Sequence, residues 1–110
     1  MSLFVNLRSS PAVRLRIVGD EIAYPSKVGG IRYARLVYNY GTDDVEIFAY
    51  SFPVRKQLPD RMRERDIVIR VSGHGKDVRY EVEALKESEL SRFQLDKIQA
   101  SRLDVRRWCK

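Results

Sequence analysis

The stretch that decides the fold is residues 31–50, which read IRYARLVYNYGTDDVEIFAY. Its first half is dense in aromatic and β-branched residues and predicts a strand over 31–40. Residues 41–44 have turn composition and residues 45–50 alternate again, so the stretch predicts a β-hairpin. The face expected to pack in the core carries Ala34, Leu36, Tyr38, Val45, Ile47 and Ala49. The opposite face carries Tyr33, Arg35, Val37, Asn39, Glu46, Phe48 and Tyr50, a mixture of rings and charges that favours exposure.

Three further strands flank this hairpin. Residues 12–24 alternate apolar side chains with arginines and polar residues, and Gly19-Asp20 predicts a bend in the middle. Residues 67–71 and 78–82 alternate on either side of a turn. Residues 53–65 are polar and predict an irregular connection with room for one helical turn. The sequence therefore predicts a mainly β domain.

The last part of the chain predicts a helix over about 88–104, with Ser88 as the N-cap. Its apolar residues offer more surface than a helix that plugs one end of a small domain needs. We expect them to form an assembly surface for a homo- or hetero-oligomer, the alternative being a helix that folds back and seals the sheet. These residues are Leu90, Phe93, Ile98, Leu103 and Trp108.

Composition indicates one domain over residues 1–110, since this length is typical of a single core. No apolar run approaches the roughly 18 residues of a membrane span, and the first residues lack the pattern of a signal peptide. Cys109 is the only cysteine, which excludes an internal disulfide and a cysteine-based zinc cluster. We expect an intracellular location, in the cytoplasm or nucleoid. Few Asn, Gln, Met and Cys residues favour a thermophilic source.

Charge favours an anionic partner, because the net charge is +6 and the pI about 9.7. Residues 1–40 and 52–76 are the two basic blocks, and an acidic turn around Asp43 and Asp44 separates them. Folded onto one face, the blocks would attract phosphates. The alternative is a solvated surface that is merely rich in arginine.

Catalytic residues are scarce. His74 is the only histidine and lies between two glycines of a predicted turn, and Cys109 is the penultimate residue. The glycine-rich segments lack the Lys-Ser/Thr of a phosphate-binding loop. We therefore expect no enzyme activity, no metal site and no cofactor.

The remaining pattern is rings interleaved with basic residues, which is typical of single-strand binding. Tyr33, Phe48 and Tyr50 are expected to stack on bases. Arg35, Arg55, Lys56, Arg61, Arg63 and Lys76 are expected to meet phosphates. The alternative is that the rings pack beneath the C-terminal helix or against a partner protein.

Two segments resemble the single-stranded-DNA-binding barrels of the replication protein A type. Residues 36–47, LVYNYGTDDVEI, are similar to their second and third strands, and residues 65–73, RDIVIRVSG, to their fourth. The turn departs from that pattern, with Tyr40 in place of an acidic residue and Asp43 in place of a second glycine. The resemblance implies a five-stranded Greek-key barrel of the oligonucleotide/oligosaccharide-binding (OB) fold over about residues 12–85, followed by an assembly helix. It also implies that Tyr50 is the third-strand ring that stacks on a base.

The expected function is non-enzymatic binding of single-stranded nucleic acid, DNA in the first place, in replication or repair. The alternative is a small scaffolding subunit of a larger nucleic-acid-processing or ribonucleoprotein complex, in which the barrel contacts protein.

Overall fold

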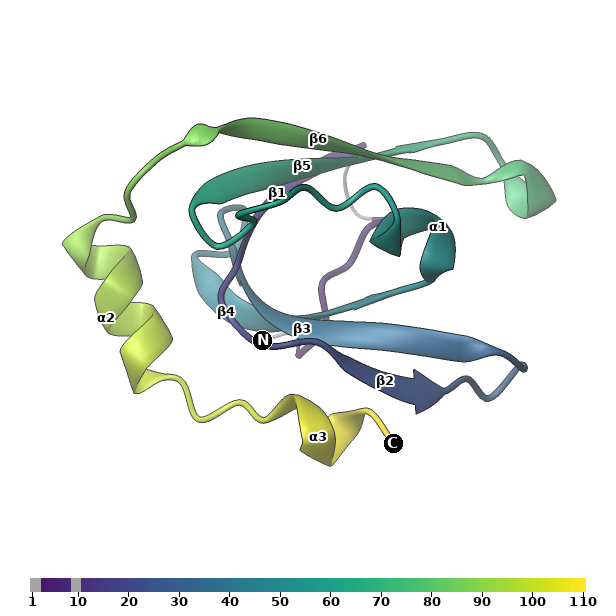
Figure 1. The fold of residues 1–110 in the computed structure, drawn as a ribbon, viewed down its shortest axis with the longest axis horizontal. Coiled ribbons are helices and arrows are strands. Elements are labelled where there is room, and N and C mark those ends of the chain that lie inside the picture. The colour runs from purple at the N-terminus through teal and green to yellow at the C-terminus, as the bar shows by residue number, and fades with distance from the viewer. Residues whose placement is uncertain (1–2, 9–10) are drawn as a thin grey trace.

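A computed structural model describes residues 3–8 and 11–110, and consists of a curled antiparallel sheet with short helices (Figure 1). The strands are β1 (Ala12–Ile17), β2 (Ile22–Pro25), β3 (Ile31–Asn39), β4 (Asp44–Tyr50), β5 (Arg65–Ser72) and β6 (Arg79–Glu87). The helices are α1 (Phe52–Arg55), α2 (Arg92–Ala100) and α3 (Val105–Trp108), with a short 3-10 turn η1 (Gly75–Asp77). In the six-stranded sheet β3 pairs with β1, β2 and β4, β1 also pairs with β5, and β5 pairs with β6.

The predicted bend divides the first long strand into β1 and β2, and both parts pair with β3. The backbone N–H groups of Val18 and Gly19 both donate to the carbonyl oxygen of Leu36, at 3.0 and 3.2 Å. Two donors on one acceptor make a bulge that turns the strand. A Cβ on Gly19 would lie 3.0 Å from the Leu36 Cβ, so glycine lets the two strands approach.

The predicted hairpin is confirmed. β3 and β4 pair from Tyr33 opposite Tyr50 to Asn39 opposite Asp44. Asp43 adopts the left-handed conformation (φ 53°), and its carboxylate accepts a 2.9 Å hydrogen bond from the Tyr38 hydroxyl. The Asp43 side chain thus links the turn to β3, the strand that precedes it.

The expected mainly β fold is confirmed, but the expected five-stranded barrel is not formed, because the antiparallel sheet has six strands and stays open between β4 and β6. Within residues 3–8 and 11–110 these two strands form no pairs. Other groups take up their edges. Ile47 of β4 bonds to the backbone of Leu3 and Val5. The side-chain amide of Gln57, just beyond α1, bonds to the Tyr80 oxygen and the Val82 N–H of β6, at 2.9 and 3.0 Å.

The hairpin face that we expected in the core is buried, but the expectation that the opposite face is exposed is wrong. The main core lies on the face that we expected to be exposed and contains Val13, Leu15, Ile17, Val37, Phe48, Tyr50, Val54, Ile67 and Ile69. The opposite face of β3 and β4 forms a second cluster, in which Ala34 and Ile47 pack against Val105 and Cys109. Both faces are buried because the curled sheet encloses one and the C-terminal segment covers the other.

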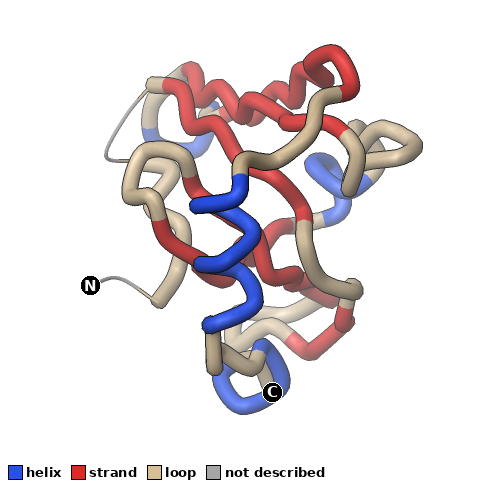
Figure 2. The backbone as a smooth tube through the Cα atoms, turned by 90° about the vertical axis from the view of Figure 1, so that its left-hand side faces the viewer, coloured by secondary structure: helices blue, strands red, loops and turns tan. Residues whose placement is uncertain are grey.

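The C-terminal helix is shorter than expected and interrupted. It begins after Ser91, whose hydroxyl and backbone form a capping box with Gln94. Ser88, the expected cap, lies before the helix, and its hydroxyl and carbonyl oxygens accept hydrogen bonds from Arg16 of β1. Residues 101–104 are extended before α3 begins after Asp104. Figure 2 shows α2 crossing one side of the molecule and α3 following below it.

Candidate nucleic-acid interface

The rings expected to stack on bases do not form an open platform. Phe48 and Tyr50 are 0% and 2% exposed, and their rings pack on each other with centroids 4.8 Å apart. Tyr33 is half-buried, with its ring 5.9 Å from that of Tyr50. The Arg55 guanidinium covers the Tyr33 ring at 4.6 Å. The expectation that Phe48 and Tyr50 lie on an exposed face is therefore wrong.

The Tyr50 hydroxyl is anchored inside the protein. It donates a 2.6 Å hydrogen bond to Glu21 and accepts a 3.1 Å bond from the Nε of Arg35. Burial, and next the hydrogen bond to Glu21, raise the pKa of Tyr50 far above its usual value. Burial also raises the pKa of Glu21, but hydrogen bonds from Tyr50 and Arg55 outweigh it and hold that pKa below its usual value. Arg35, which also bonds to the Gly19 oxygen at 3.1 Å, thus supports the core.

Several arginines expected to meet phosphates are held by acidic side chains. Arg55 binds Glu21 at 3.0 Å, and Arg61 binds Glu87 at 3.4 Å. Arg63 is paired with Asp20. Of the expected phosphate ligands, Lys56 and Lys76 are exposed and form no ion pair within the described residues. A lysine or arginine that already has a carboxylate partner gains less binding free energy from a phosphate, because the phosphate must replace that partner.

Four basic residues that have no acidic partner among the described residues lie instead around Tyr80 of β6. Three hollows in the surface, of about 410, 440 and 80 Å³, share Tyr80 as a lining residue. We call their combined lining the Tyr80 surface. Its basic residues are Arg8, Arg32, Lys56 and Arg79, and among its lining residues only Glu81 is acidic. None of these four basic side chains forms an ion pair with another described residue.

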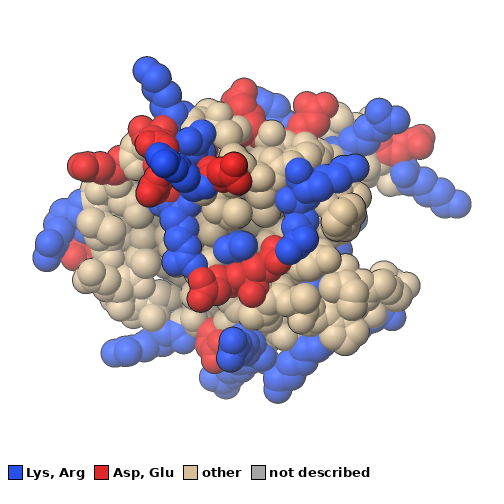
Figure 3. All heavy atoms as spheres, in the orientation of Figure 1, with Lys and Arg blue, Asp and Glu red and all other residues tan. Residues whose placement is uncertain are grey.

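The helix α1 forms one side of the Tyr80 surface. Pro53, Lys56 and Gln57 line one hollow, and the two bonds from Gln57 to β6 hold this segment beside Tyr80. Phe52, the neighbour of Pro53 in the chain, is 56% exposed. In Figure 3 the surface is notched between the β5–β6 connection and the β2–β3 connection, on the side where α1 lies in Figure 1. A half-buried ring and basic side chains therefore line a concave part of the surface, and the exposed Phe52 directly precedes Pro53, one of the lining residues.

A second polar cluster holds the sheet together and is structural. Asp66 of β5 is buried, and its carboxylate accepts hydrogen bonds from Arg14, Arg16 and Tyr40 at 2.6 to 2.9 Å. Arg16 also bonds to the backbone oxygens of Arg63 and Ser88. This network joins β1, β3 and β5 to the segments that flank them. Burial raises the pKa of Asp66, but the hydrogen bonds from one tyrosine and two arginines outweigh it and hold that pKa below its usual value.

The residues expected to form an assembly surface divide into two groups. Leu90, Ile98 and Leu103 are half-buried, and Leu103 packs against the second cluster. Phe93 and Trp108 are exposed, with Lys97 over the first ring at 5.7 Å and Arg107 over the second at 5.5 Å. The C-terminal segment thus covers the sheet with one side and presents rings and bases on the other.

Sequence reasoning missed Phe52, Tyr80, Arg79, Arg8 and Arg32 as candidate site residues. Tyr80 has the strand alternation of a core residue, and Phe52 stands beside a proline in a connection without regular pattern. The one available indication was charge. Arg79 and Lys76 lie close together at the turn after the fourth predicted strand, next to the only aromatic residue of the fifth.

Comparison with known proteins gives no match to this chain among family models, curated proteins or solved structures. Among the residues that the structure describes, no helix is long and apolar enough to span a membrane.

Proposed function

We propose that this protein binds single-stranded nucleic acid without catalysing a reaction, and that it does so on the Tyr80 surface. The observation that carries the proposal is a set of four basic side chains, without ion pairs to other described residues, around the half-buried Tyr80 and near the exposed Phe52. Bases of a single strand stack on such rings, while lysine and arginine neutralise the phosphates. Of the stacking rings that the sequence suggested on β3 and β4, only Tyr50 lines this surface, in its smallest hollow.

The order of strand pairing supports this proposal. With β1 and β2 taken as one bent strand, the pairs β1–β3, β3–β4, β1–β5 and β5–β6 follow the succession expected of an OB barrel that lacks its closing pair. OB folds bind oligonucleotides on the face of their second and third strands and with the loops between strands one and two and between strands four and five. The corresponding connections here are residues 26–30 and 73–78, and the second of them lines the Tyr80 surface.

The test is a fluorescence-anisotropy titration of the full chain with single- and double-stranded oligomers at two salt concentrations. A single strand is expected to bind more tightly than a duplex, and the affinity is expected to fall steeply with salt. Absence of binding at low salt, or a clear preference for duplex, contradicts the proposal.

Two exposed phenylalanines provide a matched pair of variants. Phe52→Ala is expected to weaken single-strand binding by about 1 to 3 kcal/mol, the usual contribution of one stacked ring. Phe93→Ala removes an equally exposed ring (59% against 56%) from α2 and is expected to leave binding unchanged. Equal losses in both variants would show that the Tyr80 surface is not the binding site.

A second candidate function is a scaffolding subunit that associates through its C-terminal segment. The observation in its favour is the exposure of Phe93, Leu95 and Trp108 on one stretch of chain. Under this function the two phenylalanines exchange roles. Phe93→Ala then lowers association in light scattering or pull-down, and Phe52→Ala has no effect on either measurement.

A further inference from the structure

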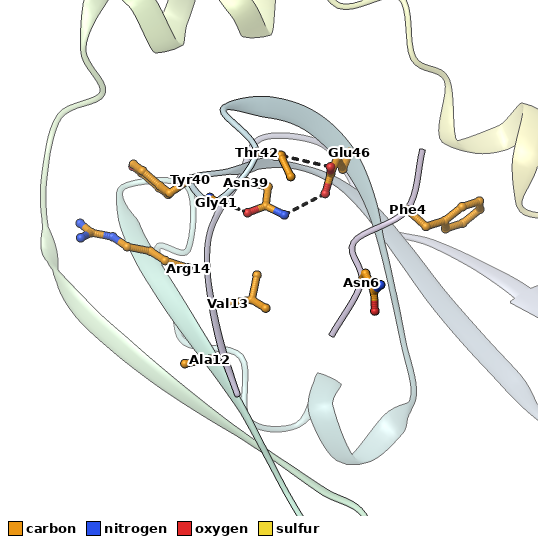
Figure 4. Close-up of a pocket in the computed structure, with 10 residues that line it drawn as sticks. All are labelled: Phe4, Asn6, Ala12, Val13, Arg14, Asn39, Tyr40, Gly41, Thr42 and Glu46. Carbon is orange, nitrogen blue, oxygen red and sulfur yellow. Dashed lines mark hydrogen bonds between the residues drawn. The ribbon is translucent and has the colours of Figure 1, made fainter. Parts of the chain in front are cut away.

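A buried carboxylate with incomplete hydrogen bonding lies in the wall of a cavity away from the Tyr80 surface. Glu46 of β4 is 2% exposed. One of its carboxylate oxygens accepts a 2.8 Å hydrogen bond from the Asn39 side chain, and the other accepts a 3.0 Å bond from the Thr42 hydroxyl. Figure 4 shows these two bonds at one side of the cavity.

Within residues 3–8 and 11–110 the carboxylate has no cationic partner. Among the ion pairs of the described residues, none includes Glu46. An ionised carboxylate has about four acceptor positions, and two of those of Glu46 are filled. Buried charges in proteins are normally paired or fully hydrogen-bonded, because an uncompensated charge in a poorly solvated site is costly. The site therefore lacks a donor, and a positive charge is the donor that suits it best.

The cavity has room for that donor and for an apolar group behind it. Its volume is about 500 Å³, and its lining combines polar groups near Glu46 with carbon surface from Phe4, Ala12 and Val13. Arg14 also contributes to the lining, but its guanidinium points away from the cavity in Figure 4 and is bonded to Asp66 at 2.6 and 2.9 Å. The positive charge nearest in the lining is thus already engaged.

We propose that this cavity binds a primary alkylammonium group, with the ammonium on Glu46 and the alkyl chain against Val13 and Phe4. An ammonium has three N–H donors, which can supply the two that the carboxylate lacks. The same chemistry is offered by a free aliphatic amine and by a lysine side chain of a partner protein.

The experiment is a titration of the ¹⁵N-labelled full chain at low salt, followed by two-dimensional NMR. n-Butylammonium is the probe for a free amine, and Nα-acetyl-lysine methylamide is the probe for a lysine side chain. 1-Butanol has nearly the same shape without the charge. We expect saturable shifts of the Gly41 and Thr42 backbone amides and of the Asn39 side-chain amide with the amines, and none with the alcohol. Tighter binding of the lysine probe points to a partner protein, and tighter binding of butylammonium to a free amine.

Glu46→Gln is expected to weaken amine binding roughly 10- to 100-fold, the usual effect of losing a hydrogen bond to a charged group. Asp44→Asn is the matched control, since it removes the same charge from the same strand at a residue outside the cavity lining. Its amine affinity is expected to stay that of the wild type.

Equal shifts with the alcohol and the amines, no saturable shift with either amine, or unchanged affinity in Glu46→Gln overturns the proposal. If Glu46→Gln does not fold, the comparison of amine with alcohol on the wild-type protein decides alone. None of these outcomes depends on nucleic-acid binding.

Discussion

The sharpest prediction separates arginines that have an acidic partner from arginines that do not. Arg79 lines the Tyr80 surface and forms no ion pair with another described residue, whereas Arg61 is bound to Glu87 at 3.4 Å. Both side chains are exposed and both were available as phosphate ligands by composition alone. Alanine at each position removes the same charge from the protein. Only Arg79→Ala is expected to remove a phosphate contact.

The magnitude follows from counterion release. Each phosphate of a single strand that is neutralised contributes about −0.7 to the slope of log Kobs against log salt concentration. If each of the four basic side chains of the Tyr80 surface neutralises one phosphate, the slope is about −2.8, which corresponds to a roughly 50-fold loss of affinity between 50 and 200 mM salt. Arg79→Ala is expected to reduce the slope to about −2.1, which corresponds to a roughly 20-fold loss over the same interval.

The assay is the anisotropy titration with a single-stranded oligomer, repeated at five or more salt concentrations for the wild type and both variants. Arg61→Ala is expected to keep the wild-type slope, because Arg61 lies outside the lining of the Tyr80 surface and is bound to Glu87, which it shares with Arg65. A smaller slope in Arg61→Ala together with an unchanged slope in Arg79→Ala would refute the assignment of the binding site. Equal reduction in both would show that net charge, and not a defined surface, governs binding.

Two further predictions concern stability. Tyr50→Ala is expected to lower the free energy of unfolding by about 3 to 5 kcal/mol, because it empties the core and removes the hydrogen-bond partner of Glu21 and Arg35. Urea denaturation measures this loss. A Tyr50→Ala protein that keeps its full stability but no longer binds nucleic acid would show that Tyr50 acts in binding and not in the core. Asp66→Asn is expected to lower the free energy of unfolding by about 3 to 5 kcal/mol at pH 7, since it leaves the buried Arg16 without a counter-charge. Because the folded-state pKa of Asp66 lies below its unfolded value, its contribution is present above about pH 4 and is lost as the pH falls through the folded-state pKa. The difference between wild type and variant should therefore shrink in urea melts from pH 5 to pH 2, and a constant difference would contradict this linkage.

The sequence predicts the strands well where local features decide them. The β3–β4 hairpin depends on neighbouring residues, namely alternation on both sides of a turn at 40–43. The break between β1 and β2 is likewise local, since Gly19 is where the chain needs both a bulge and a close approach to Leu36. The boundaries of these elements lie within a few residues of the prediction.

The faces of the hairpin could not be predicted, because they depend on what covers the sheet from a distance. Ala34 and Ile47 are buried only because Val105 and Cys109, far along the chain, pack on them. Phe48 and Tyr50 are buried because the sheet curls around them. An alternating strand with two buried faces resembles one with a polar binding face when its inner side includes charged residues such as Arg35, which bonds to the Tyr50 hydroxyl and the Gly19 oxygen inside the protein.

The candidate binding residues were misplaced for the same reason. Arg63 pairs with Asp20 and Arg55 with Glu21, each across more than 30 positions of sequence. A count of charges along the chain shows a basic block at 52–76, but it does not show which members are compensated by distant acids. Among the described residues, Lys56 and Lys76 of that block have no acidic partner, but Arg8, Arg32 and Arg79, which have none either, lie outside it.

Gln57 lies both at the unpaired edge of β6 and in the lining of the Tyr80 surface. Had β4 and β6 paired, the backbone groups of Tyr80 and Val82 would bond to a neighbouring strand. They bond instead to the side-chain amide of Gln57, which occupies the place of a strand with a single residue. The Gln57 side chain bonds to two backbone groups of β6 but, unlike a strand, does not extend along that edge. A hollow remains beside it, and Lys56 and Tyr80 both line this hollow. Gln57 therefore holds Lys56 and the segment after α1 beside Tyr80, at an edge of β6 that no described strand covers.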